Sequence, residues 1–402
     1  MRVQDIDSRL SRITSFLAAE RFSAAAGRVS AALKYNPNWH LQPRVPAGGP
    51  DSAAIFGLDG RMRPARLLPH LLLFASALIS LPLVAGFLNR VHPAFDSFAH
   101  FRLHLAVLLG LTAVALLATR FRREGAVALV LALGAFVATP GTALRGLVFP
   151  EATAHQPPPA DRAVYRLLHV NARFDNAEPG RLLSLIGRIR PDVVTVNEVS
   201  SMWRGRLALI AHAYPYTVFC EGRSAVGGVA ILSRRPFSRD AKPPCEDGGA
   251  LAIARIEFSG QSAEIAALHL DWPWPFDQPA QIARLGPVLA NLPEATLLTG
   301  DFNAVRWSQP VRKIAQDGRL NRVGPTSATW LHRALPKALR GSIGLGIDHV
   351  LSGEAVDVHS VAVVEDVASD HLPVITEFSL RPRPTDEGDT PGVQTVRLAA
   401  RH

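Results

Sequence analysis

Acids, amides and histidines stand at the ends of several apolar stretches in the second half of the chain. The clearest stretch is LLTGDFNAVRW, which runs from Leu297 to Trp307 and places Asp301 and Asn303 after a buried-strand pattern. The glycine before them lets a backbone turn sharply, so these polar side chains are expected at the rim of a sheet, where binding groups are common. Taken alone, the same residues also fit an ordinary Asx turn that closes a strand.

The same pattern recurs along the chain, which favours one shared site over separate turns. The candidate residues are Asn171, Glu198, His269, Asp301, Asn303, Asp348, Asp370 and His371. Read singly, Asn171 and His269 fit strand caps, Asp348 fits a turn, and His371 fits a surface position. Read together, their carboxylate and amide oxygens suit Mg²⁺ or a similar hard cation. The sequence has neither an HExxH motif nor clustered cysteines, which argues against zinc.

Short apolar runs between these residues predict the elements that position them. Eight runs are typical of strands: 165–172, 191–199, 228–233, 251–258, 263–270, 295–302, 346–353 and 374–380. Two stretches with helical periodicity, 180–190 and 279–292, lie between some of them. Because hairpin-like neighbours mix with strand–helix–strand units, we predict an α+β fold: a four-layered α/β sandwich of two mixed β-sheets flanked by helices.

The excess of apolar residues lies before residue 150 and predicts a membrane region. Of the 402 residues 48% are hydrophobic, and three stretches contain no Lys, Arg, Asp or Glu: Leu67–Leu88, Leu103–Thr119 and Gly125–Leu144. Each is about long enough to cross roughly 30 Å of hydrocarbon as a helix. We predict three transmembrane helices. The alternative is a buried helical hairpin plus one span, and the third stretch is interrupted by Pro140 and Gly141.

The arginines beside these stretches predict the orientation. One cluster, Arg61, Arg63 and Arg66, precedes the first span, and another, Arg120, Arg122 and Arg123, lies in the loop between the second and third spans. The other flanks carry fewer arginines: Arg90 and Arg102 between the first and second spans, and Arg145 after the third. The positive-inside rule then places the N-terminus in the cytoplasm and everything after about residue 150 outside it. We therefore expect a multi-pass protein of the plasma (inner) membrane. Since these arginines supply much of the net charge of +9, that charge is weak evidence for nucleic-acid binding.

Composition divides the chain into five parts. These are a poorly ordered or weakly helical N-terminal extension (1–60), the membrane region (61–147), a Pro-rich linker (148–162), a catalytic domain (163–380) and a disordered tail (381–402). Met62 is followed by a basic flank and a span, so it is an alternative start of the protein.

Seven motifs of the predicted catalytic domain carry a family resemblance. HVNARFDN, DVVTVNEVS, GGVAILSRRPF, AALHLDWP, LLTGDFNA, GIDHVLSG and ASDHLPV follow one another within residues 165–378. In this order they resemble the endonuclease/exonuclease/phosphatase superfamily, which includes deoxyribonuclease I, abasic-site endonucleases, sphingomyelinases and inositol-phosphate 5-phosphatases. With three spans before this domain, the whole chain is most similar to a membrane-anchored bacterial branch.

The resemblance implies a role for each candidate residue. Glu198 would be the main ligand of Mg²⁺, or alternatively Mn²⁺, helped by Asn171 and Asp370. Asp301 would orient or deprotonate the attacking water, and Asn303 would hold a phosphate oxygen. His371 paired with Asp348 would stabilise the transition state or transfer a proton, and His269 would contact the phosphate or assist the leaving group. Some relatives carry a second acid where this chain has Arg173, which argues against a second metal.

The implied function is metal-dependent hydrolysis of a phosphodiester or phosphomonoester outside the cytoplasm, as a nuclease or a phosphodiesterase acting on lipid or sugar phosphates. The expected partners are a nucleic acid or a lipid headgroup and the lipid bilayer, with no obligate protein partner. The alternative is a catalytically silent membrane scaffold. Aromatic residues of this domain would stack on a base or sugar, dip into lipid, or simply pack: Trp272, Trp274, Phe276, Trp307 and Trp330.

The only two cysteines, Cys220 and Cys245, lie in the domain assigned to the oxidising side. We therefore predict a disulfide between them, with two free thiols as the alternative.

Overall fold

The computed structural model describes residues 64–139, 157, 159–224, 226–239, 244–325 and 327–382. By internal contacts the chain divides into two compact units, Met1–Met62 and Arg63–His402, and the described residues all belong to the second. The predicted N-terminal extension lies outside the described residues, and so do residues 61–63 and 140–147 of the predicted membrane region, which include the end of the third predicted span. The same holds for residues 148–156 and 158 of the predicted linker and residues 383–402 of the predicted tail.

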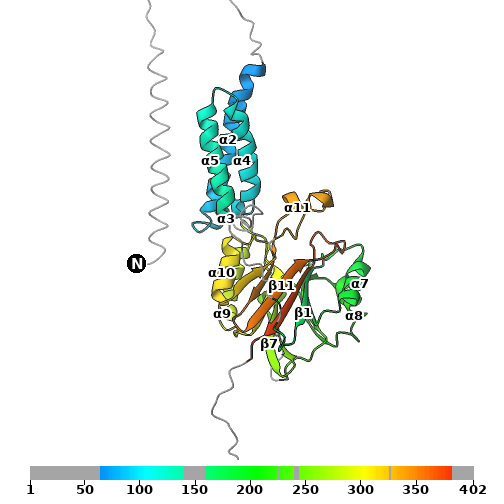
Figure 1. The fold of residues 1–402 in the computed structure, drawn as a ribbon. Coiled ribbons are helices and arrows are strands. Elements are labelled where there is room, and N and C mark those ends of the chain that lie inside the picture. Colours follow the sequence, from blue (N-terminus) through cyan, green and yellow to red (C-terminus); the bar gives the residue numbers. More distant parts are fainter. Residues whose placement is uncertain are drawn as a thin grey trace, which may run out of the picture. The chain divides into compact units, whose positions relative to one another are not determined.

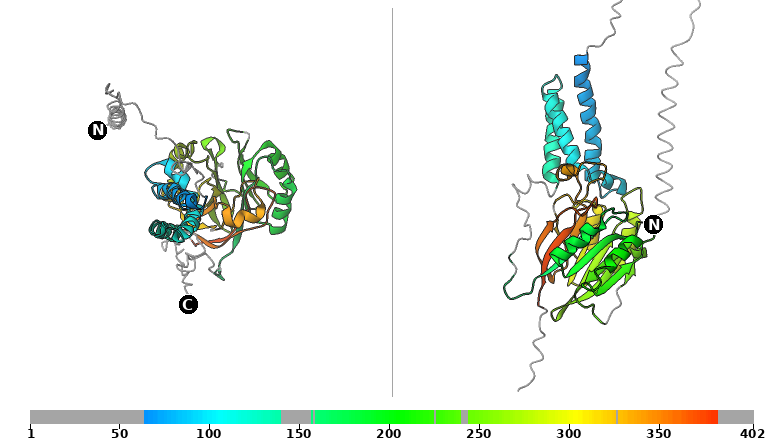
Figure 2. Two further views of the ribbon diagram at one scale, coloured as in Figure 1. Left: turned by 90° about the horizontal axis from the view of Figure 1, so that it is seen from above. Right: turned by 90° about the vertical axis from the view of Figure 1, so that its right-hand side faces the viewer.

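Within residues 64–139, four helices form the helical region that precedes the sheets. They are α2 (Pro64–Phe87), the short α3 (Pro93–Ala99), α4 (Arg102–Leu117) and α5 (Arg122–Ala138). Figures 1 and 2 show α2, α4 and α5 side by side. Small residues line the contact, with Ala106, Ala113 and Ala132 buried beside Leu83 and Leu109, so the backbones can approach closely.

The helical region bears on the prediction of membrane spans. Within the described part of the chain, one helix, over Leu67–Phe87, is long and apolar enough to cross a membrane by itself. Helices α3 and α4 form a pair bent by 62° that makes a second candidate if it is counted as one span, and α5 has 17 residues. A membrane anchor therefore has support from α2, and the three-span arrangement stays a prediction.

The remaining described residues fold into two six-stranded sheets. The first has the order β11-β12-β1-β2-β4-β3 and the second the order β5-β6-β7-β8-β10-β9. The first sheet contains β1 (Tyr165–Asn171), β2 (Val193–Val199), β3 (Tyr216–Cys220), β4 (Gly228–Ser233), β11 (Val356–Val363) and β12 (Val374–Leu380). The second contains β5 (Cys245–Glu246), β6 (Leu251–Phe258), β7 (Gln261–His269), β8 (Thr296–Asp301), β9 (Asn321–Gly324) and β10 (Asp348–Ser352). All eight predicted strands are confirmed, and β3, β5, β9 and β11 are additional.

Each sheet is built around one parallel pair joined by a helix. In the first sheet α7 (Pro179–Ile189) connects β1 to its parallel neighbour β2, and in the second α9 (Gln278–Leu289) connects β7 to its parallel neighbour β8. All other pairings are antiparallel. Because parallel strands end at the same edge, Asn171 lies opposite Asn197 and His269 lies opposite Asp301 in the register.

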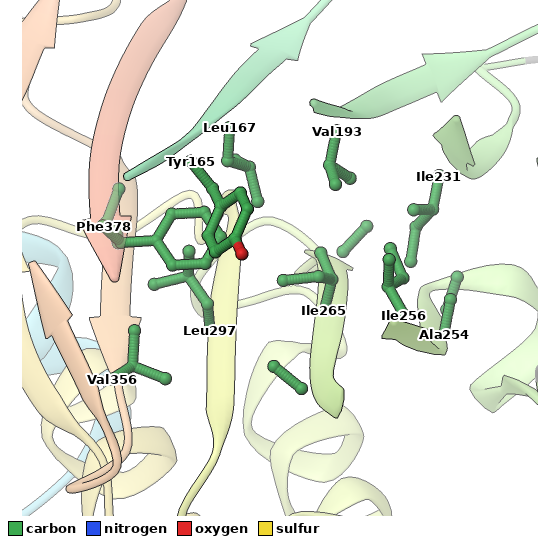
Figure 3. Packing of buried hydrophobic residues seen from close by; sticks show 14 of the residues in the cluster. Tyr165, Leu167, Val193, Ile231, Ala254, Ile256, Ile265, Leu297, Val356 and Phe378 are labelled. Carbon is green, nitrogen blue, oxygen red and sulfur yellow. The ribbon is translucent and has the colours of Figure 1, made fainter. Parts of the chain in front are cut away.

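Three apolar layers hold the sandwich together. The central layer lies between the sheets and includes Leu167 and Val193 from the first sheet and Ile265 and Leu297 from the second (Figure 3). On the outer faces α7 and α8 (Ser201–Ala208) cover the first sheet, and α9 and α10 (Gln309–Asp317) cover the second (Figure 1). The predicted four-layered sandwich of two mixed sheets is confirmed. Strands such as β4 are buried at every position because both of their faces are covered.

A disulfide joins the two sheets at one edge. Cys220 ends β3 and Cys245 begins β5, and the two cysteines are bonded with Cα atoms 5.4 Å apart. The predicted disulfide is confirmed, and the alternative of two free thiols is wrong.

Candidate active site

The predicted site residues meet where the parallel pairs of the two sheets end. Six of them line a cavity of about 510 Å³: Glu198, His269, Asp301, Asn303, Asp370 and His371. The other two, Asn171 and Asp348, are buried behind them with 0% and 1% exposure. The structure therefore brings all eight residues into one site, although they come from six separate segments of the chain.

Asp301 lies at the centre of the site. Its Oδ1 accepts a hydrogen bond from the Asn303 backbone N–H at 2.8 Å, which is the Asx turn expected from the sequence. Its Oδ2 accepts the Asn171 amide at 2.9 Å and lies 3.5 Å from His371 Nε2 and 3.7 Å from His269 Nε2. The Asx turn and the site are thus compatible, because Oδ1 closes the turn while Oδ2 contacts the other residues of the site.

Gly300 does not form the sharp backbone turn that the sequence suggested. Strand β8 does not turn at this residue but continues through Asp301. A Cβ atom on Gly300 would lie 1.9 Å from the carbonyl oxygen of Leu268 on β7. The expected sharp turn at the glycine is wrong: the glycine permits the close approach of β7 and β8 that brings His269 beside Asp301.

Glu198 is aimed into the cavity by an irregularity in β2. The pairing of β2 with β4 shifts register between Asn197 and Val199, and Glu198 has a left-handed φ of +60°. Such bulges re-aim a side chain next to a functional site. One Glu198 carboxylate oxygen accepts the Phe174 backbone N–H at 2.9 Å, and the other accepts the Asn171 amide at 3.0 Å.

Asn171 connects two carboxylates through its amide nitrogen. Nδ2 donates to both Glu198 and Asp301, whereas Oδ1 accepts the backbone N–H of Arg173 at 3.0 Å. In this arrangement Asn171 holds the acids in place, and its oxygen is turned away from them. A role as a direct ligand would require the opposite orientation of the amide.

Asp348 holds His371 from behind the cavity. The Nδ1 of His371 donates to Asp348 Oδ2 at 2.8 Å, and His169 Nε2 lies 3.3 Å from Asp348 Oδ1. Although burial raises the pKa of a carboxyl group, the charge of His371 and hydrogen bonds from both histidines hold the pKa of Asp348 below its usual value. For His371, burial lowers the pKa, but Asp348 and Asp301 outweigh it and raise the pKa to about 10. Burial is also the largest influence on Asp301 and raises its pKa.

Three supporting residues escaped the sequence analysis. His169 in β1 is fully buried and contacts Asp348, Asn197 in β2 accepts the Asp301 N–H at 3.2 Å, and Ser369 donates to the Asn171 carbonyl at 2.8 Å. His169 and Asn197 each interrupt an apolar run, which was the available signal. Ser369 precedes Asp370 in the SDH motif, but nothing in its type distinguishes it from an ordinary loop serine.

The aromatic residues separate into different roles. Trp272 and Trp330 line the cavity, and the Trp330 indole N–H donates to Asp370 Oδ2 at 3.3 Å. Trp274 and Phe276 are exposed by 48% and 63%. Trp307 packs, because its indole N–H donates to the carbonyl of Ala99 in α3 at 2.7 Å.

The donor set fits a hard cation. Glu198 and Asp370 are partly exposed carboxylates in a cavity that also holds the buried Asp301. A cation in this cavity would balance the negative charge of these acids, and oxygen donors are those that Mg²⁺ prefers. Among the described His, Cys, Asp and Glu residues, Asp301, Asp348 and His371 form a group whose ligand atoms lie within 4.8 Å of one another, so this group could also hold an ion. Because His371 and Asp348 already bond each other, the partly exposed carboxylates of Glu198 and Asp370 suit a cation better.

Comparison with known proteins agrees with this geometry. The model of the Endonuclease/Exonuclease/phosphatase family matches residues 168–371, and the chain belongs to this family of phosphoesterase-type hydrolases. The membrane-anchored bacterial branch stays a prediction.

Several solved structures are similar to part of the chain. One is an endonuclease/exonuclease/phosphatase from Beutenbergia cavernae DSM 12333, with 22% identity, a TM-score of 0.43 and coverage of 55% of this chain and 72% of that one. An AP endonuclease from Archaeoglobus fulgidus has 14% identity, a TM-score of 0.44 and coverage of 53% and 98%. Sphingomyelinase C from Streptomyces griseocarneus has 18% identity, a TM-score of 0.40 and coverage of 54% and 99%. Among curated proteins, none matches the chain.

Proposed function

We propose that the chain is a membrane-anchored, Mg²⁺-dependent phosphoesterase whose catalytic domain lies outside the cytoplasm. The observation that carries this proposal is the convergence on one cavity of Asp301, Asn303, His371 and Glu198, each already held by a hydrogen bond with another residue of the domain. Phosphoryl transfer needs little covalent help from the protein, so positioned acids and donors are the expected equipment.

Glu198 and Asp370 would hold the cation, with Asn171 keeping Glu198 in place. A bound Mg²⁺, or alternatively Mn²⁺, supplies positive charge against the phosphate oxygens. Arg173 lies in the cavity wall where some relatives have an acid, and it pairs with Asp175 at 2.6 Å. This supports a site for one ion.

Asp301 would orient the attacking water and accept its proton. Its Oδ2 faces the cavity histidines, and the raised pKa makes this carboxylate a better proton acceptor than an exposed one. His371, with a pKa raised to about 10, is protonated at neutral pH and would donate from Nε2 to a phosphate oxygen. Asp348 keeps the imidazolium in this orientation.

Asn303 and His269 would bind the phosphate from the other side. The Asn303 amide nitrogen donates to the Leu270 carbonyl at 2.8 Å, which fixes the side chain at the cavity wall. His269 is paired with Asp301 across the parallel strands, so it would contact the phosphate or assist the leaving group.

Several features support the membrane location and its side. Helix α2 exposes large apolar side chains along its length, such as Leu71 (61%), Phe74 (68%) and Leu81 (71%), as expected for a lipid-facing surface. The segment between α2 and α4 contacts the catalytic domain, so both would lie on the same side of the membrane, as three spans require. The disulfide suits an oxidising compartment.

An exposed aromatic loop favours a lipid headgroup over a nucleic acid as the substrate. Trp272 at the cavity is 59% exposed, and Trp274 and Phe276 follow it. The Trp274 carbonyl accepts a hydrogen bond from Ser97 of α3 at 3.0 Å, which places the loop beside the end of the helical region. Tryptophan is enriched at the membrane–water interface. The substrate would then be a phosphate ester at the bilayer surface.

The test is turnover by the purified full chain in detergent micelles containing phospholipid, with DNA and a generic phosphodiester as the other substrates. We expect hydrolysis that needs Mg²⁺ and stops with EDTA, and a Glu198→Gln variant whose lost activity is partly restored by extra Mg²⁺. Absence of turnover on every substrate would instead support the alternative of a silent membrane scaffold.

The proposed side of the membrane has its own test. A C-terminal alkaline phosphatase fusion should be active, whereas a reporter that fluoresces only in the cytoplasm should stay dark at the same position. The reverse result would contradict the topology.

A further inference from the structure

Residues between α2 and α4 form a polar contact with the catalytic domain. Three of them are almost fully buried although they are polar: Asn89 (4%), Asp96 (3%) and His100 (5%). Buried polar groups are expected to be hydrogen-bonded, and in this segment several of the bonds cross to the catalytic domain. We call residues 88–101 the connecting segment.

The hydrogen bonds converge on the chain that follows Asp301. His100 Nε2 lies 3.2 Å from the Asn303 carbonyl oxygen, and the Trp307 indole donates to the Ala99 carbonyl at 2.7 Å. Asp96 Oδ1 accepts the backbone N–H of Gln309 at 2.8 Å. The connecting segment thus contacts the beginning, the middle and the end of residues 303–309, which we call the catalytic loop.

The catalytic loop needs such support because its backbone is unusual. Asn303 has a left-handed φ of +46°, which costs free energy for a residue with a side chain. On its inner side the loop is held by its bond to Asp301 and by His349, whose Nε2 donates to the Ala304 carbonyl at 2.7 Å. On its outer side the His100 contact holds the Asn303 carbonyl in place.

His100 is itself held in position. Its Nδ1 lies 3.0 Å from the Asp96 carbonyl oxygen, and the Asp96 side chain is bonded to the Asn89 amide at 3.0 Å as well as to Gln309. Asp96 therefore links the first turn of α10, where backbone N–H groups lack helical partners, to the residue that reaches Asn303.

We propose that His100 and Asp96 are positioning residues of the active site, so that the helical region helps to build the catalytic centre as well as to anchor it. The inference rests on the proposed phosphoesterase function. Catalytic geometry must be held within about 0.5 Å, and a displacement of about 1 Å can lower a rate by about 10²-fold. Loss of the His100 contact should therefore act on kcat more than on KM, because Asn303 and Asp301 are displaced while the cavity wall remains.

The experiment compares three variants of the full chain in detergent. His100→Ala removes the bond to Asn303, and we expect kcat to fall about 10-fold or more. His100→Gln has a side-chain amide of comparable reach and should recover part of kcat. His104→Ala is the matched control: His104 lies four residues further along the chain, in α4, and its Nε2 also contacts the catalytic domain, but at the Ile343 carbonyl oxygen, 3.2 Å away. It should retain the parental kcat.

Hydrogen–deuterium exchange gives a readout that does not need activity. Backbone amides of the catalytic loop should exchange faster in His100→Ala than in the parental protein and in His104→Ala. If the parental protein is active while His100→Ala keeps both its kcat and its slow exchange, the positioning role is refuted and the proposed function stands. If the parental protein is inactive but exchange responds as expected, the contact is supported and the proposed function fails.

Discussion

Replacing Gly300 with alanine is expected to displace strand β8, which carries Asp301, without changing the type of any catalytic side chain. The new Cβ would lie 1.9 Å from the Leu268 carbonyl oxygen and 2.8 Å from its carbonyl carbon, whereas ordinary contact begins at 3.4 Å. The shortfall of about 1.5 Å falls on backbone atoms, so no side chain can turn away to relieve it. Strands β7 and β8 must then separate, and the pairing of His269 with Asp301 moves with them.

The size of the effect follows from this overlap. Overpacking of a buried position costs about 1–3 kcal/mol of stability, and displacement of catalytic groups by about 1 Å costs about 10²-fold in rate. The matched control is Gly286→Ala in α9, where the Cβ would meet only Asp317 Oδ2 at 3.5 Å and alanine favours the helix by about 1 kcal/mol. Thermal melting and phosphodiester turnover are measured for both variants. A Gly300→Ala protein that matches Gly286→Ala in both assays would refute the reasoning.

Two further predictions concern stability. Burial lowers the pKa of His349 to about 4, so as the pH falls from about 6.5 this histidine is protonated in the unfolded chain but stays neutral in the folded chain. The free energy of unfolding is therefore lower by about 2 kcal/mol at pH 5. The variant His349→Gln should show a weaker dependence of melting temperature on pH in this range. His371, whose pKa is raised to about 10, affects stability over a different pH range. Its contribution to the free energy of unfolding is complete below about pH 6.5 and is lost as the pH rises toward 10. Reduction of the disulfide between Cys220 and Cys245, which are 25 residues apart, should lower the free energy of unfolding by roughly 3 kcal/mol. Equal melting temperatures with and without reductant would contradict this. As a control, the melting temperature of Cys245→Ser should not change with reductant.

The sequence predicts the sheets well because both of their faces are covered. Fully buried strands such as β4 and β8 appear as short apolar runs with polar residues at their ends. Strand β11 was missed because its burial is mixed, so its residues VDVHSVAV contain no long apolar run. Strand β5 has only two residues, which is too short for any periodicity.

The residues of the site were accessible to prediction for the same reason, since they follow the strands. The sequence could not predict which of these side chains contact each other. His169 reads as a histidine within a buried strand, and only the fold places it against Asp348. The orientation of the Asn171 amide depends on two carboxylates that are 27 and 130 residues away in the chain.

The contact between the connecting segment and the catalytic loop is a second feature without a local signal. Asp96 and His100 lie between two apolar stretches and look like ordinary polar residues of a loop. Their partners lie more than 200 residues away along the chain, in the catalytic domain. Pairing over such a separation depends on tertiary structure, which neither composition nor periodicity reports.

Turnover by an Asp301→Asn variant tests the central claim most directly. Asparagine keeps the shape of the side chain and can still accept the Asn303 N–H that closes the turn, but it can neither take a proton from water nor carry the negative charge. At saturating Mg²⁺ the variant is expected to lose nearly all phosphoester hydrolysis while it melts as a folded protein. An Asp301→Asn protein that is folded and hydrolyses the substrate at the parental rate would contradict the account and leave Asp301 as a turn residue.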